Sequence, residues 1–269
     1  MRAKCLCATA IVLALITTTA SFASAQDTPP SPPAEAEAPP APPPTGFRSF
    51  LRTTGADFAS FPQRKSTWVI LGAGAAAALL AHPADDSANA HLVGSPAVGR
   101  FFAPGKWAGS MWTHAGLSAG LLAGGHYLAP NFTDASGTNK LTHLGYDLVR
   151  AQILSQTYIH SLKKAVRRDR PTGECCAFPS GHAATAFAAA SVIERHFGYR
   201  AALPTLAIAA YVGVSRLHDN RHYVSDVLFG SAIGMATGWT VVGRHGRDEY
   251  ALVPMPVRGG MGVMLTRTN

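Results

Sequence analysis

The chain has 269 residues, of which 47% are hydrophobic and 14% charged, and its net charge is +8 at pH 7. This length suits one large domain or two small ones, and the composition fits a packed helical core as well as a membrane bundle. A basic chain favours anionic substrates or an anionic membrane surface. No basic stretch is interleaved with aromatic residues, which argues against nucleic acid as a partner.

Residues 1–25 are predicted to be a secretory signal peptide. Arg2 and Lys4 precede an uncharged run, and Ala23-Ser24-Ala25 matches the small-residue cleavage pattern. The mature chain would then begin at Gln26, with 21 basic and 15 acidic residues and a net charge of +6. An uncleaved membrane anchor is the alternative interpretation of this segment.

Residues 26–46 are rich in Pro and Ala and are predicted to form a disordered or extended linker. The pattern becomes helical in residues 47–245, which we predict to be the functional domain. Residues 246–269 are a C-terminal extension, in which 250–257 and 261–266 flank Arg258-Gly259-Gly260 and suggest a small β-hairpin.

Hydrophobic periodicity and helix-stop signals predict an all-α fold, a helical bundle of about six core helices. A short amphipathic helix is expected to end at Pro62, and an apolar Ala/Gly-rich helix is expected to stop at Pro83 and the acidic pair Asp85-Asp86. The predicted helices are residues 47–61, 67–82, 107–128, 141–166, 183–197, 203–216 and 223–242.

Two cysteines remain after the predicted cleavage, and they are adjacent: Cys175 and Cys176. They do not form a disulfide framework. Export to an oxidising compartment permits a vicinal disulfide, although such a ring is strained. The sequence leaves open whether the pair is a disulfide or two thiols.

Three segments concentrate the reactive side chains: residues 163–171, 179–182 and 215–226. Three cations stand in the first and the third of them. Lys163 and Arg170 lie at the end of the helix predicted at 141–166, and Arg216 ends a later helix. Guanidinium and ammonium groups suit tetrahedral oxyanions. Ser180 and Gly181 precede an apolar helix, so their backbone N–H groups are expected to face an anion at its N-terminus. Together these groups predict a phosphate cage.

Two histidines and one carboxylate complete the predicted site. His222 and Asp226 are four residues apart and share one face if a helix begins there. The carboxylate would keep one imidazole nitrogen protonated, leaving the other to attack phosphorus. His182 would be the general acid on the opposite side. The fixed cations neutralise the charge, so we expect neither a metal nor a cofactor.

Each segment alone is typical of a helix boundary, a turn or a surface pair, but the three in this order point to one site. The spacings K-x6-R-P, P-S-G-H and S-R-x5-H-x3-D, between residues 141 and 242, resemble the superfamily of type 2 phosphatidic acid phosphatases and vanadium haloperoxidases. The resemblance implies a helical bundle with the site at one end and a phosphohistidine on His222. His182 would be the acid and Asp226 the partner of His222. Phosphate would be held by Lys163, Arg170, Ser180, Gly181 and Arg216.

One stretch departs from the pattern of the superfamily. Between Arg216 and His222, many lipid-directed members are apolar, whereas this chain reads Leu-His-Asp-Asn-Arg. This leaves the substrate open and assigns Asp219 and Arg221 to the loop or to supporting roles. The other histidines have no ligand spacing that indicates a metal and are expected to be polar positions on helices: His82, His91, His114, His126, His143 and His160.

Only residues 66–84 and 107–133 are uncharged for long enough to span a membrane. Three full crossings after an exported N-terminus would place the site inside the cell. We therefore favour a globular or membrane-peripheral domain in the periplasm or cell envelope, with the inner membrane as the alternative. Arg64 and Lys65 argue mildly for the alternative by the positive-inside rule.

The sequence thus predicts an exported, metal-independent phosphatase of phosphate monoesters or diphosphates, with a lipid-linked substrate favoured. A soluble acid phosphatase and a vanadate-dependent haloperoxidase are the alternatives. The short connection between Pro171 and Pro179 argues against the haloperoxidase. The intact set of His182, His222 and Asp226 argues against a catalytically silent envelope protein. The sequence leaves the substrate and the oligomeric state open.

Overall fold

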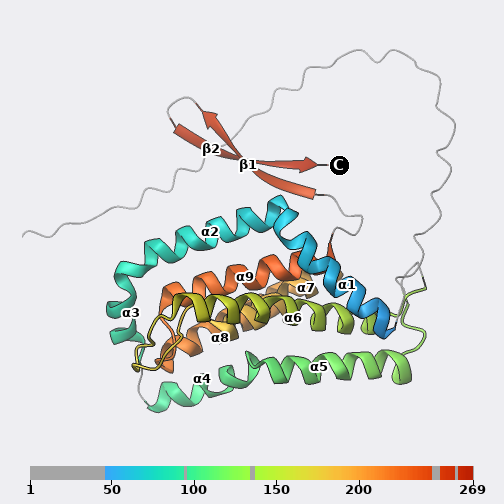
Figure 1. The fold of residues 1–269 in the computed structure, drawn as a ribbon, viewed down its shortest axis with the longest axis horizontal. Coiled ribbons are helices and arrows are strands. Elements are labelled where there is room, and N and C mark those ends of the chain that lie inside the picture. The colour runs from blue at the N-terminus through green and yellow to red at the C-terminus, as the bar shows by residue number, and fades with distance from the viewer. Residues whose placement is uncertain (1–45, 94–95, 134–136, 244–248, 258–259, 269) are drawn as a thin grey trace, which may run out of the picture. The chain divides into compact units, whose positions relative to one another are not determined.

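The computed structural model describes residues 46–93, 96–133, 137–243, 249–257 and 260–268. The predicted signal peptide and nearly all of the predicted linker lie outside these residues. Two strands, β1 (Glu249–Val257) and β2 (Gly260–Thr268), pair antiparallel at the position where the sequence suggests a hairpin. Every other long element in the described part is a helix (Figure 1), so the all-α prediction is confirmed.

The helices follow the chain with short connections (Figure 1). Their bounds are α1 Phe47–Ser60, α2 Lys65–Ala81, α3 Asp85–Leu92, α4 Pro96–Ala108, α5 Met111–Ala123, α6 Lys140–Val166, α7 Gly181–Phe197, α8 Tyr199–His218 and α9 Val224–Val242. Short 3₁₀ turns follow α1 at Phe61–Gln63 and α2 at His82–Ala84, and a π-helical turn, Gly124–Leu128, follows α5.

One predicted helix was wrong and one helix was missed. The single helix expected at 107–128 is broken between α4 and α5 at Gly109, where a Cβ atom would lie 2.5 Å from Val212 and 3.0 Å from His182. The helix expected to stop at Pro83 does end there, with Ala81 as its last α-helical residue, but the acidic pair Asp85-Asp86 then begins a further helix, α3, that was not predicted. Acidic residues in a first helical turn are favourable because they face the positive end of the helix dipole.

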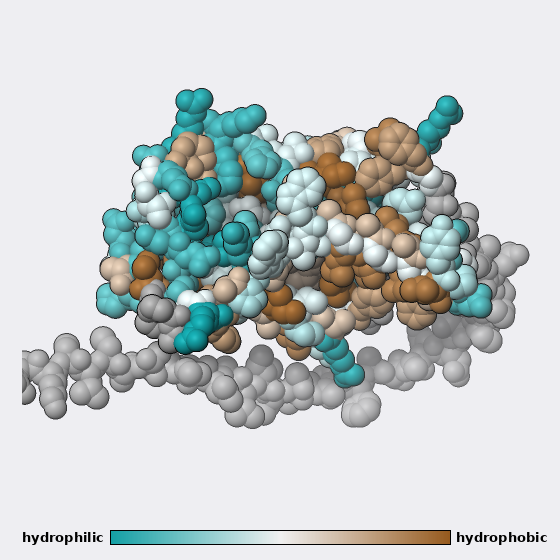
Figure 2. All heavy atoms as spheres, turned by 90° about the horizontal axis from the view of Figure 1, so that it is seen from below, coloured by the Kyte–Doolittle hydropathy of each residue, from teal (hydrophilic) through white to brown (hydrophobic). Residues whose placement is uncertain are grey.

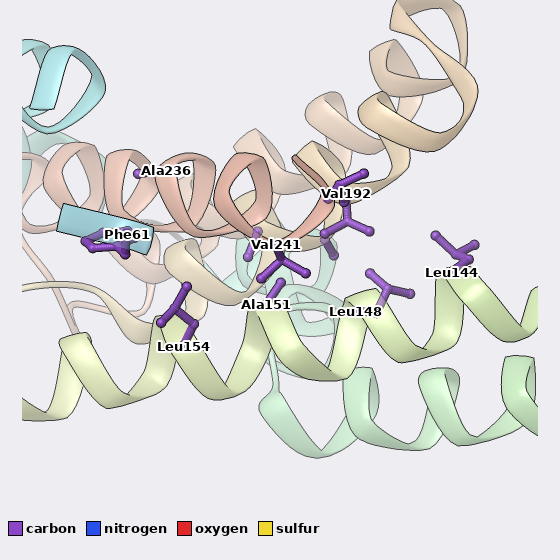
Figure 3. Close-up of a cluster of buried hydrophobic side chains, with 11 residues drawn as sticks. Phe61, Leu144, Leu148, Ala151, Leu154, Val192, Ala236 and Val241 are labelled. Atoms are coloured by element: carbon purple, nitrogen blue, oxygen red, sulfur yellow. The ribbon is translucent and has the colours of Figure 1, made fainter. Parts of the chain in front are cut away.

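The centre of the bundle is the packing of α7 on α9, with α6 alongside both. Figure 3 shows part of this core, where Leu148 and Leu154 of α6 lie near Val192 of α7 and Val241 of α9. Small residues bring the helices close together. A Cβ atom on Gly234 of α9 would lie 2.3 Å from the carbonyl oxygen of Ala184 in α7. The Ala- and Gly-rich composition therefore serves a close helix crossing.

Gly234→Ala is expected to destabilise the fold by about 1–3 kcal/mol, the usual cost of overpacking a core. The helix propensity of Ala, worth about 1 kcal/mol over Gly, offsets only part of this cost. Thermal or urea unfolding measures the change. Gly72→Ala in α2 is the matched control, because nothing lies within 4 Å of its Cβ position; it should be neutral or slightly stabilising. Equal stability of the two variants would contradict the tight α7–α9 contact.

Apolar side chains remain on the outer faces of several helices. Large exposed ones include Trp68, Leu79 and Leu80 on α2, Trp107 on α4 and Trp112 on α5. Figure 2 shows hydrophilic residues gathered at one end of the face it views and hydrophobic residues over much of the rest. Within the described residues, one helical stretch, Lys65–Leu92, is long and apolar enough to cross a membrane.

Candidate active site

The three predicted segments meet at one end of the bundle. The C-terminal end of α6 supplies Lys163, the first turn of α7 supplies His182, and the segment between α8 and α9 supplies His222. These groups are close enough to change one another's ionisation: His222 and Lys163 both help to lower the pKa of His182. The structure therefore brings the predicted residues together.

His222 and Asp226 form the predicted pair. His222 Nδ1 lies 3.6 Å from Asp226 Oδ2, which is an ion-pair distance longer than a good hydrogen bond. Both side chains are buried, with 5% of His222 and none of Asp226 exposed. Burial lowers the pKa of His222, with Asp226 opposing this and Lys163 and Arg170 adding to it. The imidazole is therefore neutral at pH 7, the state that a nucleophile requires.

His182 stands in the first turn of α7 and packs against Gly109. Its pKa is lowered to about 4, first by burial and then by the positive charge of Arg216 and by His222; a hydrogen bond with the Lys106 backbone opposes the shift. A bound phosphate would offset this positive surrounding and raise the pKa again. The site can therefore protonate His182 when an anionic substrate is present.

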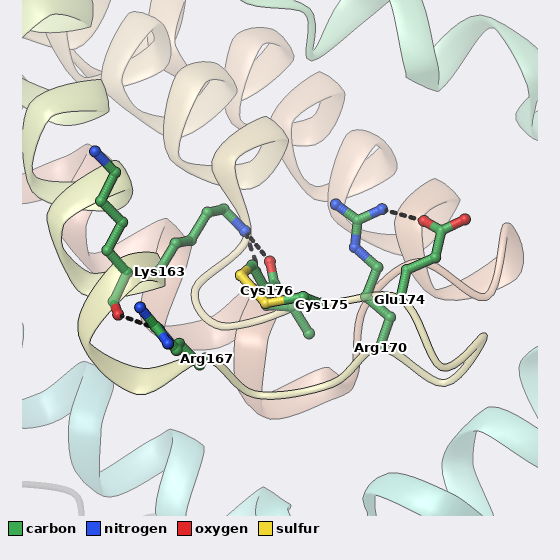
Figure 4. The surroundings of a disulfide bond; sticks show 8 residues. Lys163, Arg167, Arg170, Glu174, Cys175 and Cys176 are labelled. Carbon is green, nitrogen blue, oxygen red and sulfur yellow. Dashed lines mark hydrogen bonds and ion pairs between the residues drawn. A yellow bond between two sulfur atoms is a disulfide. The ribbon is translucent and has the colours of Figure 1, made fainter.

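Lys163 is held by the loop that connects α6 to α7 (Figure 4). Its Nζ donates to the backbone oxygens of Cys176, at 2.6 Å, and Ala177, at 3.2 Å. An ammonium has three donors, so a third remains for a ligand. Cys175 and Cys176 form a vicinal disulfide in this loop, which decides between the two states that the sequence leaves open.

The ionisation of Lys163 should limit activity at high pH. Burial, followed by the charge of Arg170, lowers the pKa of Lys163 to about 8, while Asp226 opposes the shift. As the pH rises through about 8, Lys163 loses its charge and the free enzyme loses a phosphate ligand. We expect kcat/KM to fall by about tenfold per pH unit above that point. In Lys163→Arg the side chain stays charged over the whole pH range, so kcat/KM of this variant should not fall above about pH 8. The same fall in the variant would exclude Lys163 as its cause.

The two predicted arginines each have an acidic neighbour. Arg170 Nη1 donates to Glu174 Oε2 at 2.8 Å, and Glu174 also binds Arg221 at 2.7 Å. Arg216 is buried and pairs with Asp219 through a short contact. The loop residue Asp219 therefore contacts one arginine of the predicted phosphate cage directly, and Arg221 is linked to the other through Glu174. Arg170 Nε is buried and has no hydrogen-bond partner within the described residues.

The first turn of α7 differs from the prediction at one group. The Ser180 hydroxyl caps the helix, with its Oγ 3.5 Å from the Ala183 nitrogen. The Ser180 backbone N–H donates to the Asp226 carbonyl at 2.9 Å, so this group does not face a phosphate as expected. The N–H groups of Gly181 and His182 begin the helix and have no acceptor within it. An anion would therefore meet these two groups.

Arg168, which was not among the predicted site residues, holds the carboxylate of Asp226. Its Nη1 donates to Asp226 Oδ1 at 2.8 Å and its Nη2 to Asp85 Oδ2 at 2.9 Å. Asp85 Oδ1 in turn accepts from the Ser225 backbone N–H at 3.0 Å, and the Tyr223 N–H donates to Asp226 Oδ2 at 2.8 Å. Asp226 thus has fixed donors on both oxygens. The only signal in the sequence was the place of Arg168 within the basic segment; nothing there pointed to Asp85.

The region that holds the site matches a known family. Residues 141–249 match the PAP2 superfamily. This range contains each of the motifs that meet at the site, from Lys163 to Asp226. The segment is a PAP2 superfamily domain. The recognition made from the three motif spacings is therefore confirmed.

Two curated relatives of this PAP2 domain cover part of the chain. The lipid A 1-phosphatase of Porphyromonas gingivalis is 39% identical over 84 residues, 30% of this chain and 19% of that protein. The lipid A 4′-phosphatase of Helicobacter pylori is 28% identical over 120 residues, 40% of this chain and 61% of that protein. The chain thus spans less than two thirds of either relative.

One solved structure supports the PAP2 fold. It is a transmembrane PAP2-type phosphatidylglycerolphosphate phosphatase from Bacillus subtilis, with a TM-score of 0.54. The match covers 65% of this chain and 92% of that one at 20% sequence identity. At this identity the likeness concerns the arrangement of the helices alone.

Proposed function

We propose that the chain is a metal-independent phosphatase that removes a phosphate group from a lipid of the cell envelope, with a phosphorylated lipid A as the favoured substrate. The observation that carries this proposal is the buried His222, which lies beside Asp226 and near the cations Lys163 and Arg170, while Arg216 lies near His182. A neutral imidazole among fixed cations suits attack on a phosphate ester.

The reaction would proceed in two steps. In the first, His222 Nε2 attacks phosphorus, the bond to the lipid oxygen breaks, and His182 gives its proton to that oxygen. In the second, His182 takes a proton from water, and the water oxygen displaces His222 from phosphorus and releases inorganic phosphate. Lys163, Arg170 and Arg216 would balance the charge that spreads over the phosphoryl oxygens in both steps.

The choice of lipid A rests on the names of the two curated relatives, which act on its 1- and 4′-phosphates. A surface depression beside the site has a mixed lining, in which the polar side chains that suit a headgroup are joined by apolar ones: Asp86, Asn89 and Asn220, with Ala90, Val93, Pro171 and Tyr223. Asn220 belongs to the stretch that departs from the apolar pattern of many lipid-directed members. We infer that this stretch faces the headgroup and not an acyl chain.

The place of action would be the envelope membrane. The apolar stretch Lys65–Leu92 and the exposed aromatic side chains of α4 and α5 give the domain a surface that suits lipid. A lipid substrate would then reach the site without leaving the membrane surface. Fractionation of cells that express the chain tests this: we expect recovery with membranes, and recovery only in the osmotic-shock fluid would contradict it.

Phosphate release from purified protein in EDTA tests the function. Lipid A would be compared with phosphatidylglycerol phosphate, phosphatidic acid and p-nitrophenyl phosphate, and mass spectrometry of the lipid would locate the lost phosphate. We expect the highest kcat/KM on lipid A. Faster hydrolysis of the soluble ester would indicate the soluble acid phosphatase instead, and no release from any substrate would overturn the proposal.

A further inference from the structure

We propose that His143, Asp147 and His196 form a zinc site at the end of the bundle remote from the active site. Within the described residues, one ligand atom from each of these side chains lies within 4.8 Å of the other two. Asp147 and Lys163 are both on α6, sixteen residues apart, which corresponds to about 24 Å along the helix. The cluster therefore has no part in the phosphatase chemistry.

Two helices supply the ligands. His143 and Asp147 are four residues apart on α6 and share one face, while His196 comes from the last turn of α7. His196 Nε2 lies 2.9 Å and His143 Nε2 lies 3.4 Å from the same oxygen, Asp147 Oδ2. Two nitrogens and one carboxylate oxygen are a usual protein ligand set for zinc, with a fourth position for water.

The distances suit a metal as well as hydrogen bonds. Zinc–ligand bonds of about 2.0–2.1 Å in a tetrahedron put neighbouring ligand atoms about 3.3 Å apart. The 3.4 Å between His143 Nε2 and Asp147 Oδ2 is close to that value and is longer than a good hydrogen bond. Shifts of less than about 1 Å would bring all three atoms to tetrahedral spacing.

Arg150 binds one oxygen of Asp147 and not the other, Oδ2, which the two histidines approach. It binds Asp57 with Nε and Nη2, at 2.8 and 2.7 Å, and reaches only Oδ1 of Asp147, at 2.7 Å. Such a hydrogen bond to the second oxygen is what orients a metal-bound carboxylate. Asp57 and Asp147 share Arg150, and Arg64 also acts on Asp57, so a divalent cation at Oδ2 would add positive charge on the histidine side of Asp147.

The burial of the ligands fits a site that is accessible at one edge. The Asp147 side chain is 1% exposed, that of His196 9% and that of His143 20%. An ion can therefore enter past His143, and water can fill the fourth position. By joining α6 to α7, zinc would stabilise the end of the bundle opposite the phosphate cage.

Calorimetric titration of chelator-treated full-length protein with Zn²⁺ tests the site. We expect one zinc per chain, a rise in Tm with zinc, and Kd raised at least about tenfold in His196→Ala and in His143→Ala. The matched control is His160→Ala, an exposed histidine on the same helix, which should bind as the parent does. Visible absorption of bound Co²⁺ gives a second readout for the same variants.

His222→Ala separates the remote site from the catalytic histidines. If zinc instead binds at the catalytic histidines, binding would be lost in His222→Ala and kept in His196→Ala, and that result would overturn the proposal. No zinc binding, or a Kd unchanged in both remote variants, would also overturn it and leave a hydrogen-bonded triad. Circular dichroism will show whether His196→Ala folds. If it does not, the Kd of His143→Ala, which changes the more exposed ligand, decides between the outcomes.

Discussion

His222→Ala is expected to lower kcat by at least about 10⁴-fold, because removal of a catalytic nucleophile removes the covalent route altogether. His222 is buried against Asp226, and burial lowers its pKa so that the imidazole is neutral at pH 7. Substrate binding should change much less, because the phosphate cage of Lys163, Arg170 and Arg216 stays in place. The measurement is kcat and KM for lipid A and p-nitrophenyl phosphate.

His160→Ala, the exposed histidine of α6, is the matched control for this variant and should have parent-like kinetics. A His222→Ala enzyme that keeps more than about a tenth of the parent kcat would contradict the assignment of the nucleophile. A loss confined to KM would instead make His222 a binding residue.

Arg168→Leu is expected to have the second largest effect. It leaves Asp226 and Asp85, which are 0% and 2% exposed, without their shared cation. Breaking a buried pair costs about 3–5 kcal/mol, and the 22% exposure of the Arg168 side chain places the expected loss near the lower value. Misplacement of Asp226 should also lower kcat by about 10–100-fold, the usual effect of removing a group that orients a ligand.

Arg168 is a positioning residue, so its loss should lower kcat while KM changes little. Urea unfolding gives the stability and steady-state kinetics give the split between kcat and KM. Arg167→Leu, at an exposed neighbour, should leave both unchanged, and Arg168→Lys should recover part of kcat. A rise in KM at constant kcat would mean that Arg168 binds the phosphate instead.

The proposed catalytic groups could be found in the sequence because their spacing is local. Lys163 lies in the last turn of α6 and Arg170 four residues beyond its end, while His222 lies two residues before α9 and Asp226 in its first turn, so the members of each pair are close along the chain. The long helices α6 and α9 could also be predicted from the sequence, since hydrophobic periodicity over many residues is the strongest signal of secondary structure.

What the sequence could not predict depends on contacts between distant segments. Asp85 meets Arg168 across 83 residues, and Asp147 meets His196 across 49. The break between α4 and α5 lies where Gly109 approaches Val212 closely, and no local sequence pattern predicts that contact. The role of the Ser180 N–H was mispredicted for the same reason, since its acceptor is on Asp226. Tertiary partners decide such positions.

The most direct test of the account is detection of a phosphohistidine on His222. His182→Ala, which lacks the group that activates water, would be mixed with p-nitrophenyl phosphate, whose leaving group needs little protonation, and quenched in alkali. We predict a stoichiometric phosphoryl group on the His222 peptide by mass spectrometry, stable in base, lost in acid, and absent in His222→Ala. A phosphoryl group on another residue, or none while turnover continues, would contradict the mechanism.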